Sequence, residues 1–152
     1  MVLKKGEERK SPEKGLSWER IEVTVQRSPR VLIVEDDSMI AYSNKLLLES
    51  SGFTVIGIVD EAVSGLLLAE ASPPEIAIID VHIHGAIDGI SVARQLSETY
   101  GTQIVFVTGQ PDAVLRQTAD LHDVTLLAKP FQSEDLLAAI TEGLSGERYR
   151  VA

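Results

Sequence analysis

The sequence contains no cysteine. This absence excludes disulfide bonds, zinc sites with thiolate ligands and cysteine nucleophiles, so any metal must be held by oxygen or histidine ligands. The sequence also has no apolar run of the roughly 18 residues that cross a bilayer, and its N-terminus lacks the apolar segment of a secretory signal. We therefore expect a cytoplasmic protein with no membrane partner.

Positive charge is scarce outside the N-terminus. The net charge is −9 over 152 residues, but residues 1–28 hold seven basic and five acidic residues, which leaves seven basic and 18 acidic residues for the rest. An acidic body repels phosphate backbones, so we expect no direct binding of nucleic acid. A Gly-x-x-x-x-Gly-Lys-Ser/Thr loop is also missing, which argues against a P-loop nucleotide site.

The N-terminal segment differs in composition from the rest of the chain. Residues 1–17 are charged and interrupted by glycine and proline, which is typical of a flexible arm. Residues 18–25 (WERIEVTV) then alternate apolar and polar side chains, so they are either an extended linker or an extra strand or partner-binding segment. We expect an arm over residues 1–28, one domain over residues 29–146 and a tail over residues 147–152.

Within the domain, buried strands alternate with helices. The expected strands cover residues 31–34, 53–59, 76–80, 104–107 and 124–127. The expected helices cover residues 39–50, a segment capped by Asp60, then 90–100, 111–121 and a last helix from 133 to near Gly146. Asp37 is expected to cap the first helix, and the last should bury Leu136, Leu137, Ile140 and Leu144. This alternation predicts a parallel sheet in a three-layer α/β/α sandwich.

The third expected strand, Ile76-Ala77-Ile78-Ile79-Asp80, is apolar until it ends on a carboxylate. Ligands bind outside the carboxyl ends of strands in open α/β sheets, so Asp80 is better placed for chemistry than for packing. Other strands end near further polar groups, namely Glu35, Asp36, Thr108 and Lys129. Carboxylates gathered at one edge repel one another unless a cation such as Mg²⁺ offsets them. A hydroxyl and an ammonium nearby favour a phosphoryl group, with Asp80 as candidate nucleophile.

Five short motifs follow one another along the domain: Val-Leu-Ile-Val-Glu-Asp-Asp (31–37), Ile-Ile-Asp (78–80), Asp88-Gly89, Val-Thr-Gly (107–109) and Lys-Pro-Phe (129–131). With these motifs in this order, residues 30–145 resemble the receiver domain of bacterial two-component response regulators. The resemblance implies a flavodoxin-like fold with a five-stranded parallel sheet of order 2-1-3-4-5.

The resemblance also implies roles for single residues. Asp80 would accept a phosphoryl group from a histidine kinase or a histidine phosphotransfer protein. Asp36, Asp80 and the backbone carbonyl of His82 would ligate Mg²⁺, with Glu35 acting mostly through water. Thr108 and Lys129 would contact phosphoryl oxygens, and the Lys129-Pro130 peptide bond would be cis.

Two departures from the family pattern affect these expectations. The loop after Asp80 is longer than in many receivers and contains His82 and His84, which are either part of a second metal or pH-sensitive site or exposed histidines with backbone roles only. Leu126 stands three residues before Lys129, where many receivers have tyrosine or phenylalanine. Signalling is therefore expected to depend on packing changes rather than on rotation of an aromatic side chain.

The sequence thus predicts a phosphoacceptor that signals by a surface change or by passing the phosphoryl group on, and that dephosphorylates itself. Two alternatives remain open. One is a receiver-fold interaction module that binds partners regardless of phosphorylation, and the other is a receiver excised from a larger hybrid protein. A homodimer is also left open.

Overall fold

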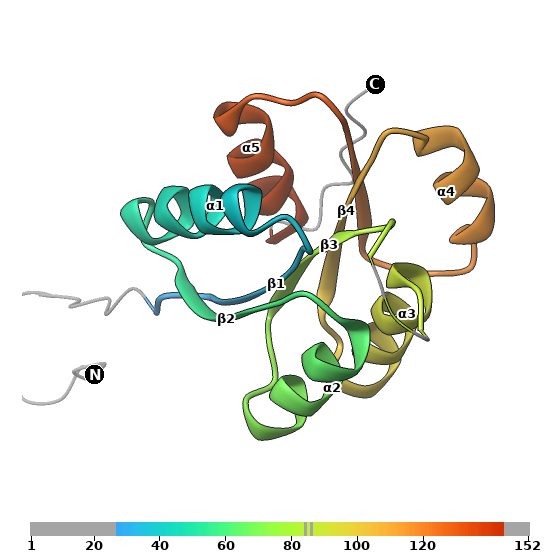
Figure 1. The fold of residues 1–152 in the computed structure, drawn as a ribbon, viewed down its shortest axis with the longest axis horizontal. Coiled ribbons are helices and arrows are strands. Elements are labelled where there is room, and N and C mark those ends of the chain that lie inside the picture. The colour runs from blue at the N-terminus through green and yellow to red at the C-terminus, as the bar shows by residue number, and fades with distance from the viewer. Residues whose placement is uncertain (1–26, 84, 86, 145–152) are drawn as a thin grey trace, which may run out of the picture.

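The computed structural model describes residues 27–83, 85 and 87–144, in which five strands alternate with five helices (Figure 1). The predicted arm up to residue 26, its candidate strand at 18–25, His84 and the predicted tail lie outside the described residues. The elements in chain order are β1 (Arg30–Val34), α1 (Ser38–Ser50), β2 (Thr54–Val59), α2 (Ala62–Ala71), β3 (Ile76–Asp80), α3 (Gly89–Tyr100), β4 (Gln103–Thr108), α4 (Pro111–Gln117), β5 (Val124–Ala128) and α5 (Ser133–Leu144).

All strands belong to one parallel sheet of order β2-β1-β3-β4-β5, which confirms the predicted fold class. The helices cover both faces, with α1 and α5 on one side and α2, α3 and α4 on the other (Figure 1). Alternate residues of β1 point into the two layers: Leu32 and Val34 pack beneath α2 and α3, whereas Val31 and Ile33 pack beneath α1 and α5. Burial on both faces explains why the strand sequences are continuously apolar.

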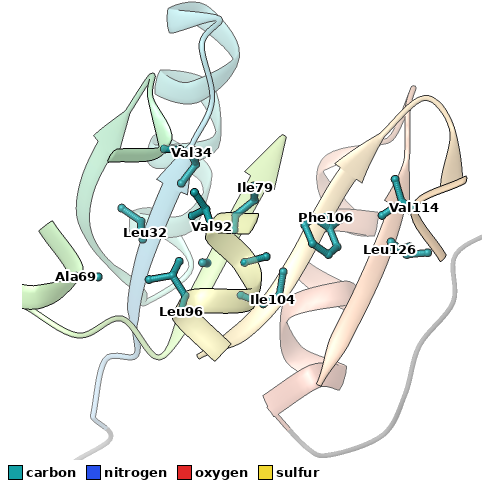
Figure 2. Close-up of a cluster of buried hydrophobic side chains, with 13 residues drawn as sticks. Leu32, Val34, Ala69, Ile79, Val92, Leu96, Ile104, Phe106, Val114 and Leu126 are labelled. Carbon is teal, nitrogen blue, oxygen red and sulfur yellow. The ribbon is translucent and has the colours of Figure 1, made fainter. Parts of the chain in front are cut away.

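The core on the α2, α3 and α4 side contains the side chains drawn in Figure 2. Its strand residues include Leu32, Ile79, Ile104 and Phe106, and Leu96 reaches it from α3. The opposite core is filled by side chains such as Leu48 from α1 and Ile140 from α5. These two packed layers hold the strand ends in fixed positions, and the candidate site is built on those ends.

Two helix starts follow the expected capping chemistry. The Asp37 carboxylate accepts hydrogen bonds from the backbone N–H groups of Met39 and Ile40, each 3.0 Å long, which confirms Asp37 as the cap of α1. Asp88 caps α3 in the same way through the N–H of Ser91. Both capped helices begin at the edge of the sheet that carries the predicted site, so their first turns are fixed there.

Three predictions about helices were wrong. The second helix begins at Ala62 and is preceded by Glu61, not capped by Asp60. Helix α4 ends at Gln117 rather than near residue 121, and the Thr118 hydroxyl there bonds to the carbonyl of Val114. Leu144 is 48% exposed, whereas Leu136 and Ile140 are fully buried. Each step of four residues turns a side chain by about 40°, so Leu144 has rotated away from the face that Leu136 presents to the core.

Candidate functional site

The five predicted side chains come together at the carboxyl edge of the sheet. Glu35 and Asp36 follow β1, Asp80 ends β3, Thr108 ends β4, and Lys129 follows β5. Because β3 lies between β1 and β4 in the sheet, Asp80 is central among them. The structure therefore brings Glu35, Asp36, Asp80 and Lys129 together and places Thr108 at the end of the neighbouring strand, while the chemical roles of these residues stay predictions.

The carboxylates of Glu35, Asp36 and Asp80 form one cluster, with a ligand atom of each within 4.8 Å of the others. Glu35 and Asp80 are only 6% and 5% exposed. Burial raises the pKa of the Glu35 carboxyl from 4.5 to about 7; the hydrogen bond from the Asp37 N–H opposes this, and the nearby Asp80 charge adds to it. Closely packed, partly desolvated carboxylates of this kind can hold a divalent cation.

Both carboxylate oxygens of Asp80 are hydrogen-bonded. The Lys129 ammonium donates to Oδ2 at 2.9 Å, and the backbone N–H of His82 donates to Oδ1 at 2.9 Å. Burial acts to lower the pKa of Lys129, but the hydrogen bond to Asp80 and the charges of Asp80, Glu35 and Asp36 outweigh it, so this pKa lies above its ordinary value. Lys129 is therefore a permanent cation that fixes the orientation of the Asp80 carboxylate.

Thr108 connects the site to the turn that leads into α4. Its buried hydroxyl accepts a 2.9 Å hydrogen bond from the N–H of Gln110, one residue before α4 begins. Its carbonyl accepts a 2.8 Å bond from the N–H of Lys129, which aligns the lysine backbone with β4. The Lys129-Pro130 peptide bond is cis, as the resemblance implied. A hydroxyl that accepts one bond keeps its own proton for an anionic ligand.

Gly89, which follows the loop after Asp80, lies against the backbone of Asp80 itself. A Cβ atom at Gly89 would lie 2.7 Å from the backbone oxygen of Asp80 and 3.0 Å from a methyl group of Ile79, so any larger residue would collide with the end of β3. Sequence reasoning used Asp88-Gly89 only as a motif and missed this contact. An Asp-Gly pair at the start of a helix that follows a candidate nucleophile was the available signal.

The loop histidines add little to the cluster. The side chain of His82 is exposed, and His84 lies outside the described residues. Within the described part of the chain, Glu35, Asp36 and Asp80 are the one group of three or more potential metal ligands close enough to share an ion. The His82 side chain therefore belongs to no second potential metal site within the described residues.

Leu126 fills the position of the aromatic residue that many receivers have. It is buried in the same core as Phe106 and Val114, and its backbone is level with Phe106 in the pairing of β4 with β5 (Figure 2). The aromatic ring of this layer therefore comes from β4, two residues before Thr108, and not from β5. Pattern comparison along β5 alone could not have found it.

Comparison with a family model identifies the class of the domain. The family model of the response regulator receiver domain matches residues 31–141. The chain therefore belongs to the family of response regulator receiver domains. In the part of the chain that the structure describes, no helix is long and apolar enough to cross a membrane.

Individual relatives support the same class. The chain is 27% identical over 124 residues to the phyllosphere-induced regulator PhyR of Methylorubrum extorquens, covering 81% of this chain and 46% of that protein. It is 33% identical over 116 residues to the probable C4-dicarboxylate response regulator DctR of Halalkalibacterium halodurans, covering 74% and 50%. The chain thus spans about half the length of these curated relatives.

A solved structure shows the same architecture. The signal receiver domain of a modulated diguanylate cyclase from Desulfovibrio desulfuricans superimposes with a TM-score of 0.70 at 31% identity, covering 79% of this chain and 96% of that one. The match supports the assignment of the fold as a receiver.

Proposed function

We propose that this receiver accepts a phosphoryl group on Asp80 from a phosphohistidine of a histidine kinase or a histidine phosphotransfer protein, and that Mg²⁺ is required. The observation that carries the proposal is the hydrogen bond from the Lys129 ammonium to Asp80, a carboxylate that also belongs to the three-carboxylate cluster. Such a site holds a nucleophile and a cation for an incoming anion together.

The proposed transfer uses one oxygen of Asp80. That oxygen attacks phosphorus, a new O–P bond forms, and the P–N bond of the donor breaks with its electron pair returning to the imidazole nitrogen. The product is an acyl phosphate, which water later hydrolyses to the carboxylate and inorganic phosphate. Since Asp80 ends a strand that is buried along its whole length, its carboxylate is held on a rigid support for this attack.

The donor set suits Mg²⁺. Oxygen ligands from Glu35, Asp36 and Asp80 are the kind this ion prefers, and the ion leaves positions for water and phosphate oxygens. In the proposal Asp36, Asp80 and the backbone carbonyl of His82 would hold the ion, and Glu35 would act mostly through water. When bound, Mg²⁺ neutralises charge on the transferring phosphoryl group.

The proposed signal begins at Thr108. Its hydroxyl proton is free to bond a phosphoryl oxygen while the same oxygen atom accepts the N–H of Gln110. A phosphoryl group on Asp80 would therefore pull on the turn that starts α4. Because Leu126 and Phe106 share a core with Val114 of α4, we propose that the response is a shift in packing of α4.

Incubation with acetyl phosphate and Mg²⁺ tests the proposal. We expect the intact protein to gain the mass of one phosphoryl group, and Asp80→Asn to gain none. Asp37→Asn is the matched control, because asparagine also caps helices and Asp37 lies at the start of α1, outside the proposed chemistry. Equal labelling of the wild type and Asp80→Asn would contradict the proposal.

A further inference from the structure

Most of the large exposed apolar side chains belong to the elements at the β2 end of the sheet. Of the eight in the described residues, seven lie on α1, β2 and α2, and the eighth is Leu144 on α5; the seven are Met39, Ile40, Tyr42, Leu46, Ile58, Val63 and Leu67. The half built from α3, β4, α4 and β5 carries none among those residues. Solvent-facing apolar side chains gathered on neighbouring elements indicate a surface that something covers.

Helix α2 shows the contrast most clearly when it is compared with its neighbour α3. Both pack on the same face of the sheet (Figure 1). The outward positions of α3 are polar, for example Gln95 and Glu98, as expected for a surface helix. The outward positions of α2 include Val63 and Leu67, four residues apart and 46% and 64% exposed.

Strand β2 runs between α1 and α2 at the edge of the sheet. Its ladder hydrogen bonds go to β1 only, so the main-chain groups on its other side have no strand partner among the described residues. Its sequence, TVIGIV, has no charge and no proline, the devices that normally protect an open edge. Ile58 is 37% exposed and lies level with Ile33, which packs beneath α1, so Ile58 faces the α1 side.

The opposite edge strand, β5, is built differently. It is also uncharged, but its three central residues are buried beneath the helices. An additional strand would therefore cover apolar side chains at β2 and few at β5. Because the exposed apolar side chains are on β2 rather than on β5, β2 is the better edge for an additional strand.

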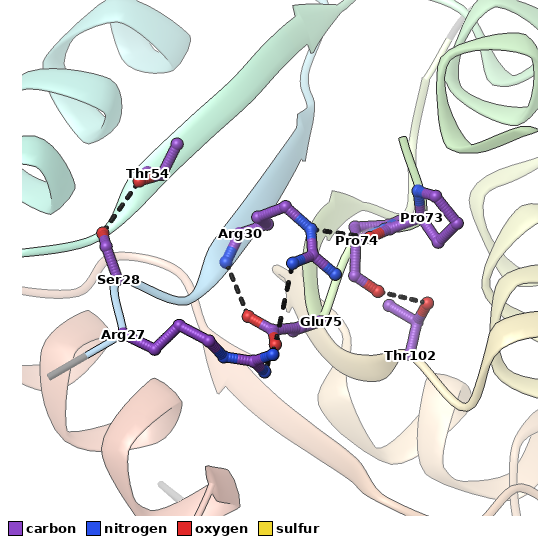
Figure 3. Close-up of polar contacts among 8 residues, drawn as sticks. All are labelled: Arg27, Ser28, Arg30, Thr54, Pro73, Pro74, Glu75 and Thr102. Atoms are coloured by element: carbon purple, nitrogen blue, oxygen red, sulfur yellow. Dashed lines mark hydrogen bonds and ion pairs between the residues drawn. The ribbon is translucent and has the colours of Figure 1, made fainter. Parts of the chain in front are cut away.

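The N-terminal arm enters the domain at the start of β2. Figure 3 shows the Ser28 hydroxyl beside Thr54, the first residue of that strand, whose hydroxyl donates to it at 2.8 Å. Ser28 also donates to the carbonyl of Gly52, and the carbonyl of Pro29 accepts from the N–H of Thr54. The chain therefore enters the domain beside the amino end of the edge strand β2, while the Arg27 side chain reaches towards Glu75, just before β3.

We propose that residues 18–25 add to β2 as an antiparallel strand and cover this edge. The direction follows from the entry point, since a segment that ends near Thr54 can follow β2 only in the opposite sense. Ile21, Val23 and Val25 would share one face, where they match the exposed Ile58, and Trp18 would lie on the other face towards α2. Eight residues are enough to span the six of β2. The proposal does not depend on phosphorylation of Asp80.

Trp18 is the single tryptophan of the chain, so fluorescence reports on this segment directly. In the full chain we expect blue-shifted emission and a several-fold lower acrylamide quenching constant than in urea. Val23→Pro removes a main-chain donor from the proposed strand and should make Trp18 accessible, while unchanged circular dichroism shows that the domain is still folded. Lys10→Pro, a matched control outside the strand, should leave Trp18 protected. Ile58→Lys, at an exposed position of β2, should act like Val23→Pro.

Two other outcomes contradict the proposal. Trp18 that is as accessible in the native chain as in urea would show that no strand is added. Protection that rises with protein concentration, together with a dimer in light scattering, would mean that a second copy covers the edge.

Discussion

The two ends of the sheet differ in their balance of positive and negative groups. At the amino end, Glu75 is bound by the guanidinium of Arg27, lies 3.9 Å from that of Arg30, and accepts the Arg30 N–H at 2.9 Å (Figure 3). At the carboxyl end, three carboxylates lie within 4.8 Å of one another, and Lys129 bonds to one of them. The first arrangement has more positive than negative charge and ties chain segments together, whereas the second has an excess of carboxylate and needs another cation.

This difference separates a structural cluster from a functional one. The amino end has two cations for one carboxylate, so it is complete as it stands. The carboxyl end keeps Glu35 buried with a pKa raised to about 7, which means that its ionised form is costly without a cation. An excess of buried carboxylate, rather than the presence of charge, is what marks the site.

The largest effect is expected at Gly89. Gly89→Ala would force its Cβ against the backbone of Asp80, so we expect phosphorylation by acetyl phosphate to slow at least about tenfold and stability to fall by about 1–3 kcal/mol. Gly109→Ala is the control, because a Cβ there meets nothing within 4 Å. Urea unfolding and intact-mass kinetics give both quantities. Similar behaviour of the two variants would show that the contact at Gly89 is unimportant.

Removing the Lys129 ammonium should increase the excess of negative charge among the three carboxylates. In Lys129→Gln the three carboxylates lose their ammonium partner, so we expect Mg²⁺ to bind several-fold more tightly while phosphorylation of Asp80 slows about tenfold or more. Calorimetric titration with Mg²⁺ measures the first change and mass spectrometry the second. Weaker binding of Mg²⁺ in Lys129→Gln would contradict a repulsive role for this cation.

The raised pKa of Glu35 predicts a pH dependence. Because this pKa is above that of the unfolded chain, the stability contributed by protonated Glu35 is full at low pH and is lost as pH rises through about 7. Mg²⁺ competes with that proton, so its affinity should fall up to about tenfold per pH unit below 7. Titrations at several pH values measure this slope. Glu35→Gln should flatten it, and an equally steep slope in that variant would exclude Glu35 as its source.

The smallest effect on the phosphoryl site is expected from a substitution at the amino end of the sheet. Glu75→Gln loses the ion pairs with Arg27 and Arg30, and we expect a loss of about 1–2 kcal/mol of stability, because the carboxylate is mostly buried and hydrogen-bonded. Affinity for Mg²⁺ and phosphorylation should stay within about twofold of the wild type. A large loss of either one would show that the two ends are coupled.

Much of the fold and the site could be predicted because it depends on local pattern. The apolar strands alternate with helices, which implies one parallel sheet, and strand ends in such a sheet share an edge. That reasoning brought Asp80, Thr108 and Lys129 together although they are far apart in sequence.

What the sequence could not predict depends mostly on contacts between residues that are far apart in the chain. The ion pair of Arg27 with Glu75 joins residues 48 apart, and no pattern selects Glu75 over other acidic residues. The collision that keeps position 89 a glycine is with the main chain of Asp80, which a side-chain pattern does not contain. The start of α2 was missed for a different reason. Asp60 is of the residue type that favours a cap, yet the helix begins after Glu61, whose side chain makes no capping hydrogen bond.

Binding of beryllofluoride, followed by ¹⁹F NMR, tests most directly the claim that the carboxyl edge is a phosphoryl site that requires a cation. We predict a bound fluoride signal with Mg²⁺ that disappears with a chelator and in Asp80→Asn, and that persists in Glu75→Gln. A bound signal that survives the chelator or the loss of Asp80 would contradict the account, as would its absence in the wild type with Mg²⁺.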